Sequence, residues 1–188
     1  MEHPAPAIRP PVALGCTFAA AGIGFAVVLI IFLLIFLNSG ANSGTVVLEK
    51  PEAYPAGTVQ YQQADNFYLV RLQDGKFLAL SDLDAANRAS SRRCRVHPLT
   101  SADPVRAQLV AQYAGRMSPQ AAGSTYLLRE DCNLAVYDFT GQRLDDEAPN
   151  LDRLAVATNK QGRLTVDVTK RTCTQRDGAQ SFAPITCP

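Results

Sequence analysis

Residues 129–144 read REDCNLAVYDFTGQRL, and this stretch indicates the fold more clearly than any other part of the chain. The segment from Leu134 to Phe139 predicts a β-strand, because apolar and aromatic residues dominate it. Gly141 follows the strand, and its tolerance of positive φ is typical of a tight turn. Cys132 lies just before the strand, in a chain that has five cysteines.

Two β-hairpins are predicted elsewhere in the chain. Residues 67–72 and 77–80 flank Asp74-Gly75, a dipeptide typical of a hairpin turn. Residues 154–157 and 164–168 flank a second turn that contains Gly162, and the second of these strands alternates apolar and polar residues. Together with short strands at 59–61 and 126–128, these hairpins predict a small antiparallel β-sandwich or barrel, so the fold class is mainly β.

The segment 98–123 permits two interpretations. Asp103-Pro104 is typical of the start of a helix, and Val105, Leu109 and Tyr113 would then lie on one helical face. The same residues also alternate well enough to form a strand. The sequence leaves both possibilities open.

Composition excludes several classes of function. The 188 residues carry a net charge of +1 and no tryptophan, which gives no support to nucleic-acid binding. There are two histidines, and no phosphate-binding loop, nucleophile elbow or zinc-spaced Cys/His cluster occurs in the sequence. We therefore expect no enzymatic activity. The cysteine content favours an oxidising compartment.

The N-terminal part contains a long apolar run. No charged residue occurs between Arg9 and Glu49, and residues 12–37 are almost wholly apolar. This run predicts a single transmembrane helix over 12–38, with a cleaved signal peptide ending near residues 41–43 as the alternative. Arg9 precedes the run and the next basic residue is Lys50, so residues 1–11 are expected in the cytoplasm and the C-terminal domain outside the cell membrane.

Small residues in the first half of this run favour docking into a larger membrane complex, although simple apolar filling explains them as well. A flexible linker is predicted over 39–57, followed by a β domain over 58–169. The tail, 170–188, contains Cys173 and Cys187 on either side of a turn at Asp177-Gly178. A disulfide between these two cysteines is predicted to secure the tail.

The stretch that contains Cys132 continues through residues 143–154, RLDDEAPNLDRL. This whole run resembles the second cluster-binding box of Rieske iron–sulfur proteins, in which Cys-Pro-Cys-His-Gly-Ser precedes an aromatic-Asp strand, a Gly turn and an Ala-Pro-x-x-Leu-Asp-Arg segment. Residues 67–81 resemble the hairpin that precedes the first box in that family. The resemblance covers residues 67–168, without a match in 98–123, and implies a Rieske-like head.

The resemblance also implies that the cluster has been lost. It aligns four residues with the cluster ligands and two with a conserved disulfide. Ala89 and Ser91 take the first-box ligand positions, Glu130 and Asn133 take those of the second box, and Cys94 and Cys132 take the disulfide positions. None of the four suits an iron–sulfur cluster, so no metal and no cofactor are expected.

One alternative alignment treats Cys94 and His97 as a shifted box with Cys132 as a further ligand. That alignment supplies one histidine where a Rieske cluster needs two.

The sequence therefore favours a non-catalytic accessory subunit of a bacterial energy-converting membrane complex, of the electron-transport or photosynthetic kind. Its expected partners are other subunits, contacted through the helix and the head, and membrane lipid. The alternatives are an electron carrier with an unusual cluster and a free-standing membrane-anchored binding domain. The basic loop 88–95 either docks against an acidic partner or is simply solvated.

Overall fold

The structure is a computed structural model that describes residues 27–34, 44–178 and 180–187. The chain forms two compact units that divide between Gly44 and Thr45. We describe each unit separately.

In the first unit, residues 27–34 form a helix whose eight apolar side chains are all exposed. None of the helices that the structure describes is long and apolar enough to cross a membrane. Eight helical residues span about 12 Å, whereas a bilayer core is about 30 Å thick. The predicted transmembrane helix over 12–38, and the single-pass localisation based on it, are therefore corrected. Residues 12–26 and 35–38 of the predicted span lie outside the described residues, as do the predicted cytoplasmic segment 1–11 and residues 39–43 of the predicted linker.

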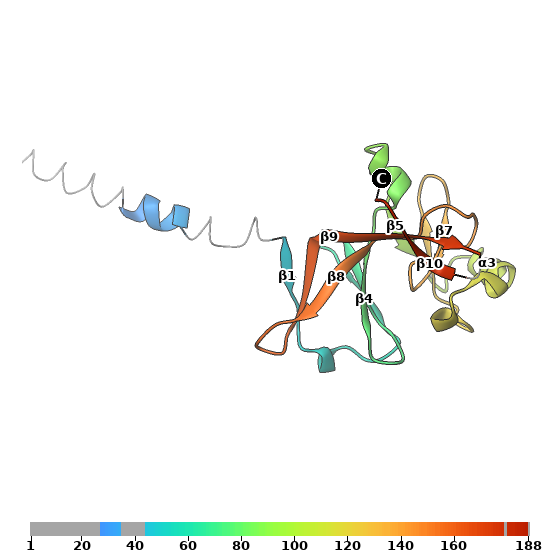
Figure 1. Ribbon diagram of the computed structural model, residues 1–188, viewed down its shortest axis with the longest axis horizontal. Helices are drawn as coiled ribbons and strands as arrows, with labels where there is room; N and C mark the ends of the chain where they lie inside the picture. The colour runs from blue at the N-terminus through green and yellow to red at the C-terminus, as the bar shows by residue number, and fades with distance from the viewer. Residues whose placement is uncertain (1–26, 35–43, 179, 188) are drawn as a thin grey trace, which may run out of the picture. The chain divides into compact units, whose positions relative to one another are not determined.

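The second unit is mainly β, as predicted, and its larger sheet is antiparallel. The strands of this sheet lie in the order β1-β9-β8-β4-β3-β2, and β10 pairs with β9. Their bounds are β1 Thr45–Val47, β2 Val59–Gln62, β3 Phe67–Arg71, β4 Phe77–Ser81, β8 Arg153–Thr158, β9 Leu164–Asp177 and β10 Gln180–Ile185. The sheet curls without closing (Figure 1), because β1 and β2 do not pair with each other in the described chain. The expected sandwich or barrel is thus a half-barrel.

A second sheet contains three antiparallel strands in the order β5-β6-β7. Their bounds are β5 Val96–Pro98, β6 Leu127–Glu130 and β7 Val136–Asp138. The helix α2, Ala85–Ala89, precedes β5, and the helix α3, Arg106–Tyr113, lies between β5 and β6. Short 3-10 helices cover Pro51–Ala53, Ala114–Arg116 and Pro119–Ala121.

Both predicted hairpins are confirmed. The first is β3–β4, which turns at Gly75 with φ of 84°. The second is β8–β9, which turns at Gly162 with φ of 76°. A residue with φ in this range is most often glycine, and this explains why the turn dipeptides predicted the hairpins correctly.

Strand β3 lies between two hydrophobic cores. Tyr68 and Val70 contribute to a core that also contains Val96 and Leu128 of the small sheet. Phe67 and Leu69 contribute to the core on the other face, inside the curled sheet. Because side chains alternate across a strand, this one strand serves both cores, and its first four residues are all buried.

The helical interpretation of residues 98–123 is confirmed in part by α3. Leu109 and Tyr113 pack against the buried residues Leu127 and Val136, so they share a face as predicted. The predicted start is wrong, since Asp103 does not cap the helix. Its Oδ2 atom instead accepts hydrogen bonds from the backbone N–H and the hydroxyl of Thr100.

The domain boundaries differ from those predicted. Strand β1 lies inside the predicted linker 39–57, yet it pairs with β9. Strand β9 crosses the predicted boundary at residue 170, and β10 pairs with it. The tail is therefore part of the sheet. The predicted Cys173–Cys187 disulfide is present, with Cα atoms 5.2 Å apart.

The strand predicted over 134–139 is shorter than expected, because only Val136–Asp138 pairs as β7. Asp138 is fully buried, and its Oδ1 atom accepts hydrogen bonds from the backbone N–H and the hydroxyl of Thr140. Its Oδ2 atom accepts from the Ser118 N–H at 2.8 Å. These bonds turn the chain at Gly141, where φ is 85°.

We predict that Gly141→Ala is more destabilising than Gly162→Ala. Both positions have positive φ, which costs an alanine about 1 kcal/mol. A Cβ atom at position 141 would also lie 3.0 Å from Leu80 Cδ2 and 3.2 Å from Leu151 Cβ, whereas position 162 has no atom within 4 Å. Overpacking adds about 1–3 kcal/mol, so chemical denaturation should show a loss of about 2–4 kcal/mol for Gly141→Ala. Equal losses would contradict the packing described here.

Candidate site at two disulfide-linked loops

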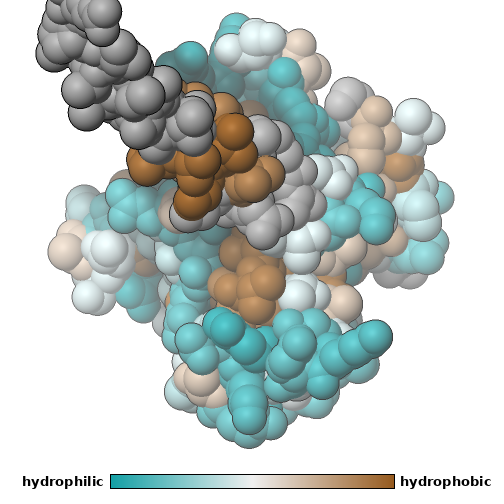
Figure 2. Space-filling model, turned by 90° about the vertical axis from the view of Figure 1, so that its left-hand side faces the viewer, coloured by the Kyte–Doolittle hydropathy of each residue, from teal (hydrophilic) through white to brown (hydrophobic). Residues whose placement is uncertain are grey.

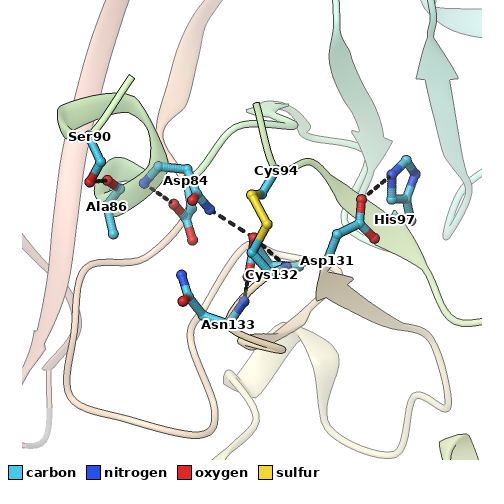
Figure 3. The surroundings of a disulfide bond; sticks show 10 residues. Asp84, Ala86, Ser90, Cys94, His97, Asp131, Cys132 and Asn133 are labelled. Atoms are coloured by element: carbon cyan, nitrogen blue, oxygen red, sulfur yellow. Dashed lines mark hydrogen bonds and ion pairs between the residues drawn. A yellow bond between two sulfur atoms is a disulfide. The ribbon is translucent and has the colours of Figure 1, made fainter. Parts of the chain in front are cut away.

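The residues that the sequence aligned with cluster ligands lie in two neighbouring loops. The first loop, residues 85–95, contains α2 and leads into β5, and the second loop, residues 130–135, connects β6 to β7. A disulfide joins Cys94 to Cys132 with Cα atoms 5.7 Å apart, as predicted (Figure 3). The Asp131 N–H also donates to the Arg95 carbonyl oxygen at 3.1 Å. Covalent and backbone contacts thus hold the two loops together.

The first loop is shaped by a helix cap. The buried Asp84 side chain accepts a hydrogen bond from the Asn87 N–H at 2.7 Å and starts α2. The helix ends at Ser90, and Ser91 then adopts positive φ of 54°. The carboxylate of Asp84 also accepts from the Tyr137 hydroxyl at 3.2 Å, which ties α2 to strand β7.

Glu130 is the central residue of the site. Its side chain is 1% exposed. The Oε1 atom accepts from Asn87 Nδ2 at 2.9 Å and from the Cys132 N–H at 2.8 Å, and the Oε2 atom accepts from the Asn133 N–H. One carboxylate therefore binds the backbone of its own loop and a side chain of the first loop.

The four aligned ligand positions do not form one site. Glu130 and Asn133 are joined by the hydrogen bond just described, but Ala89, Ser91 and Asn133 are exposed while Glu130 is buried. Alanine offers no ligand atom, and the sulfur atoms of Cys94 and Cys132 are bonded to each other. These residues do not fit a two-iron cluster, which needs two thiolates and two imidazoles in the Rieske arrangement.

The alternative alignment through His97 also finds no support in the geometry. His97 Nε2 lies 3.0 Å from Asp131 Oδ2, and both side chains are more than half exposed. An exposed pair of this kind contributes little to stability. The two cysteines that would complete the shifted box form the disulfide.

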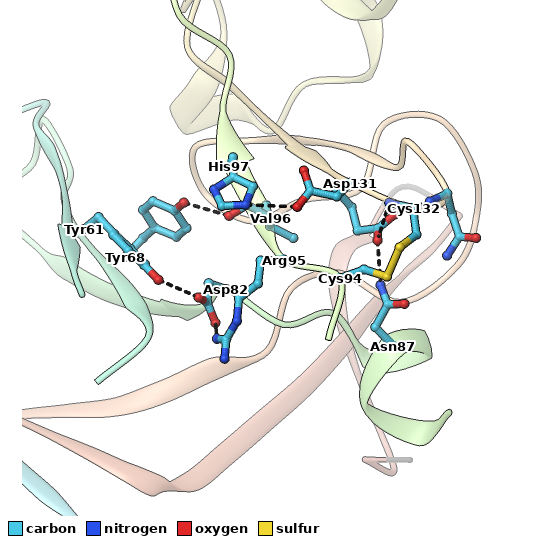
Figure 4. A network of polar contacts seen from close by, with 12 residues as sticks. Tyr61, Tyr68, Asp82, Asn87, Cys94, Arg95, Val96, His97, Asp131 and Cys132 are labelled. Carbon is cyan, nitrogen blue, oxygen red and sulfur yellow. Dashed lines mark hydrogen bonds and ion pairs between the residues drawn. A yellow bond between two sulfur atoms is a disulfide. The ribbon is translucent and has the colours of Figure 1, made fainter. Parts of the chain in front are cut away.

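A second polar network braces the first loop from the large sheet (Figure 4). Asp82 is buried, forms an ion pair with Arg95, and accepts a hydrogen bond from the Tyr61 hydroxyl at 2.7 Å. Burial and that hydrogen bond raise the pKa of Tyr61 to about 12. The Tyr68 hydroxyl donates to the Val96 carbonyl oxygen at 2.7 Å, and burial raises the pKa of Tyr68 too.

The basic residues of the loop 88–95 divide into two groups. Arg88 pairs with Asp152 and Arg95 pairs with Asp82, so these two arginines are structural. Burial raises the pKa of Asp152, and Arg88 opposes that shift. Arg92 and Arg93 are exposed, and no salt bridge in the described chain includes either of them. Arg92 and Arg93 therefore place exposed positive charge on the first loop.

Leu134, the first residue of the predicted strand 134–139, has an unusual backbone conformation. It has φ of 61°, a conformation that L-residues rarely adopt, and it is 52% exposed. In the Rieske box that this stretch resembles, glycine takes this position, which is the signal that could have identified it. In the described part of the second unit, the other large exposed hydrophobic residues are Val47 and Tyr61.

Hydrophilic residues make up most of the coloured surface in the space-filling view, and hydrophobic residues gather in a few groups (Figure 2). Leu134 of the second loop and Arg92 and Arg93 of the first loop are thus exposed.

Comparisons with known proteins add little to this description. No protein-family model matches the chain, and no curated protein matches it. A solved structure described as the small subunit of an NADH-dependent nitrite reductase from Mycobacterium tuberculosis is similar, with 14% identity and a TM-score of 0.34. The match covers 65% of this chain and 92% of that one. Similarity at this level carries no argument about function.

We predict that Glu130→Gln destabilises the protein by about 1–3 kcal/mol. Three N–H donors converge on the carboxylate, and a glutamine would place its own NH₂ group against at least one of them. The change is measured by chemical denaturation. Glu52→Gln is the matched control, because Glu52 is exposed, and it should change stability by less than about 0.5 kcal/mol. Equal effects of the two substitutions would refute the assigned role.

Proposed function

We propose that this chain is a non-catalytic accessory subunit of an electron-transferring complex, and that its β domain is a Rieske-like head without a cluster. The observation that supports the proposal is the Glu130 carboxylate, which bridges the two loops at the position that the resemblance aligns with a ligand cysteine. In Rieske proteins the cluster links two such loops. In this chain, hydrogen bonds and a disulfide link the two loops. The loops therefore need no iron–sulfur cluster to keep their shape.

The surface that meets the partner is formed by Leu134, Asn133, Arg92 and Arg93, which we call the loop tip. All four residues are exposed. The disulfide and Glu130 restrain the backbone of the tip, so little conformational entropy is lost on binding. The two arginines favour a partner with an acidic surface. Leu134 favours a partner that also offers an apolar contact.

Site-specific cross-linking tests this assignment. A photoreactive residue placed at position 134 of the full chain should form cross-links to a subunit that carries a redox group, when the protein is expressed in its native cells. The same residue at Lys160, in the β8–β9 turn, is the control and should form none. Cross-linking from both positions alike, or from neither, would overturn the proposed surface.

We predict opposite effects of Leu134→Gly on stability and on binding. Glycine removes the strain of positive φ, so the free energy of unfolding should rise by up to about 1 kcal/mol. Cross-linking from a photoreactive residue at Arg93 should nevertheless fall, because the apolar contact is lost. Leu134→Ala keeps the strain and removes most of the side chain, so it should weaken binding without the gain in stability. Unchanged cross-linking in both variants would exclude Leu134 from the interface.

The alternative, an electron carrier with an unusual cluster, predicts iron and acid-labile sulfide in the native protein. Our proposal predicts that the native protein contains neither iron nor acid-labile sulfide. It also predicts that restoring all four ligands allows a cluster to bind. A variant with Ala89→Cys, Ser91→His, Glu130→Cys and Asn133→His should acquire visible absorption after anaerobic reconstitution with iron and sulfide. The unmodified chain, treated identically, should remain colourless. Stoichiometric iron in the native chain would favour the electron carrier.

A further inference from the structure

A set of potential metal ligands meets at the disulfide, and it is not the set that the Rieske resemblance aligns with a cluster. The Sγ atoms of Cys94 and Cys132 and a carboxylate oxygen of Glu130 all lie within 4.8 Å of one another. In the oxidised protein the two sulfur atoms are bonded to each other and cannot act as thiolate ligands. The state of the disulfide therefore decides whether these atoms can bind a metal.

The hydrogen bonds of Glu130 leave one acceptor position of its carboxylate unfilled within the described chain. Each carboxylate oxygen can accept about two hydrogen bonds. The Oε1 atom accepts two, from Asn87 and Cys132, whereas the Oε2 atom accepts one, from Asn133. One lone pair of Oε2 thus remains for a cation. Carboxylates that bind metals are commonly held by such outer hydrogen bonds.

Charge and burial also favour a cation here. The buried Glu130 carboxylate takes part in no salt bridge that the structure describes. The neighbouring Asn87 is fully buried, and its Oδ1 atom lacks a hydrogen-bond partner among residues 27–34, 44–178 and 180–187. A buried charge without a counter-charge and a buried acceptor without a donor are both unfavourable. A metal ion bound to Glu130 would supply the missing counter-charge.

We propose that reduction of the Cys94–Cys132 disulfide creates a site for a thiophilic divalent cation such as Zn²⁺, bound by two thiolates and the Glu130 carboxylate. A dithiol reductant supplies the two electrons and two protons: the protein S–S bond breaks, two thiols form, and the reductant becomes a cyclic disulfide. Binding of Zn²⁺ then forms two Zn–S bonds and releases the two thiol protons. Thiolate ligands favour Zn²⁺ over Mg²⁺ or Ca²⁺.

The fold permits the change in spacing that this site requires. A disulfide holds two sulfur atoms about 2 Å apart, whereas tetrahedral zinc requires about 3.8 Å. Because Cys132 is exposed, its side chain can rotate without disturbing a core. The Glu130 hydrogen bonds hold the loops while the sulfur atoms separate. Three protein ligands leave a fourth position for water or an exogenous ligand.

Metal titration of the full chain tests the proposal. The protein is reduced with dithiothreitol, freed of reductant under anaerobic conditions, and titrated with ZnCl₂ against a chromogenic chelator. Reduced protein should bind one Zn²⁺ that the oxidised protein does not bind. Cys94→Ser with Cys132→Ser should abolish this binding while keeping the other three cysteines. Glu130→Gln should weaken it by at least about tenfold, and Glu52→Gln should leave it unchanged.

Alkylation mapping gives a readout at the level of single residues and does not depend on the stability of the variants. Zn²⁺ should slow the reaction of iodoacetamide with Cys94 and Cys132 of the reduced chain, but not with Cys173 and Cys187. The proposal fails if reduced wild-type protein binds Zn²⁺ no better than the double serine variant. It also fails if protection falls on other cysteines, or if Glu130→Gln binds as tightly as the wild type.

Discussion

The shape of the loop tip depends on one buried carboxylate. Glu130 accepts hydrogen bonds from two backbone N–H groups of its own loop and from the side chain of Asn87 in the other loop. A buried carboxylate is unfavourable unless its oxygen atoms are satisfied, so these donors must stay where they are for the residue to remain buried. That requirement links α2 to the β6–β7 turn, and the Cys94–Cys132 disulfide adds a covalent link beside it.

Three other buried carboxylates organise loops in the same way. Asp138 organises the turn after β7, Asp84 starts α2, and Asp82 joins Arg95 to Tyr61. All three aspartates are buried. Apolar side chains fill the two cores without specifying how the loops run, because hydrophobic contacts have little directionality. Hydrogen bonds to these carboxylates have direction, and they determine the course of the loops.

The backbone of the two loops is strained at two positions. Leu134 and Ser91 keep positive φ values of 61° and 54°, which are unfavourable for residues other than glycine. Such strain persists only where the surroundings hold the backbone, and here the disulfide and Glu130 do so. A leucine held in a strained conformation and half exposed is difficult to explain by folding stability alone. Contact with a partner, as proposed above, would give this side chain an apolar environment.

Several elements could be predicted from local signals in the amino-acid sequence. Asp74-Gly75 and Gly162 identified both hairpins, because a turn with positive φ selects glycine within a few residues. The apolar spacing of residues 105–113 allowed either a helix or a strand, and the fold decided for the helix α3. The positions of both disulfides followed from the resemblance and the tail sequence. The apolar run at 12–38 predicted a transmembrane helix, but none of the helices among the described residues is long and apolar enough to cross a membrane.

Roles that depend on contacts between residues distant in sequence became apparent from the folded chain alone. Glu130 and Asn87 are separated by 43 residues, and no local pattern indicates that they meet. The pairing of β1 with β9 placed a predicted linker in the sheet, since strand pairing across such distances depends on the whole chain. The division of the basic loop into two structural and two exposed arginines depends on Asp82 and Asp152, which come from other strands and loops. The burial of a side chain and the pairing of distant strands are properties of the folded chain. A local sequence pattern therefore does not predict them directly.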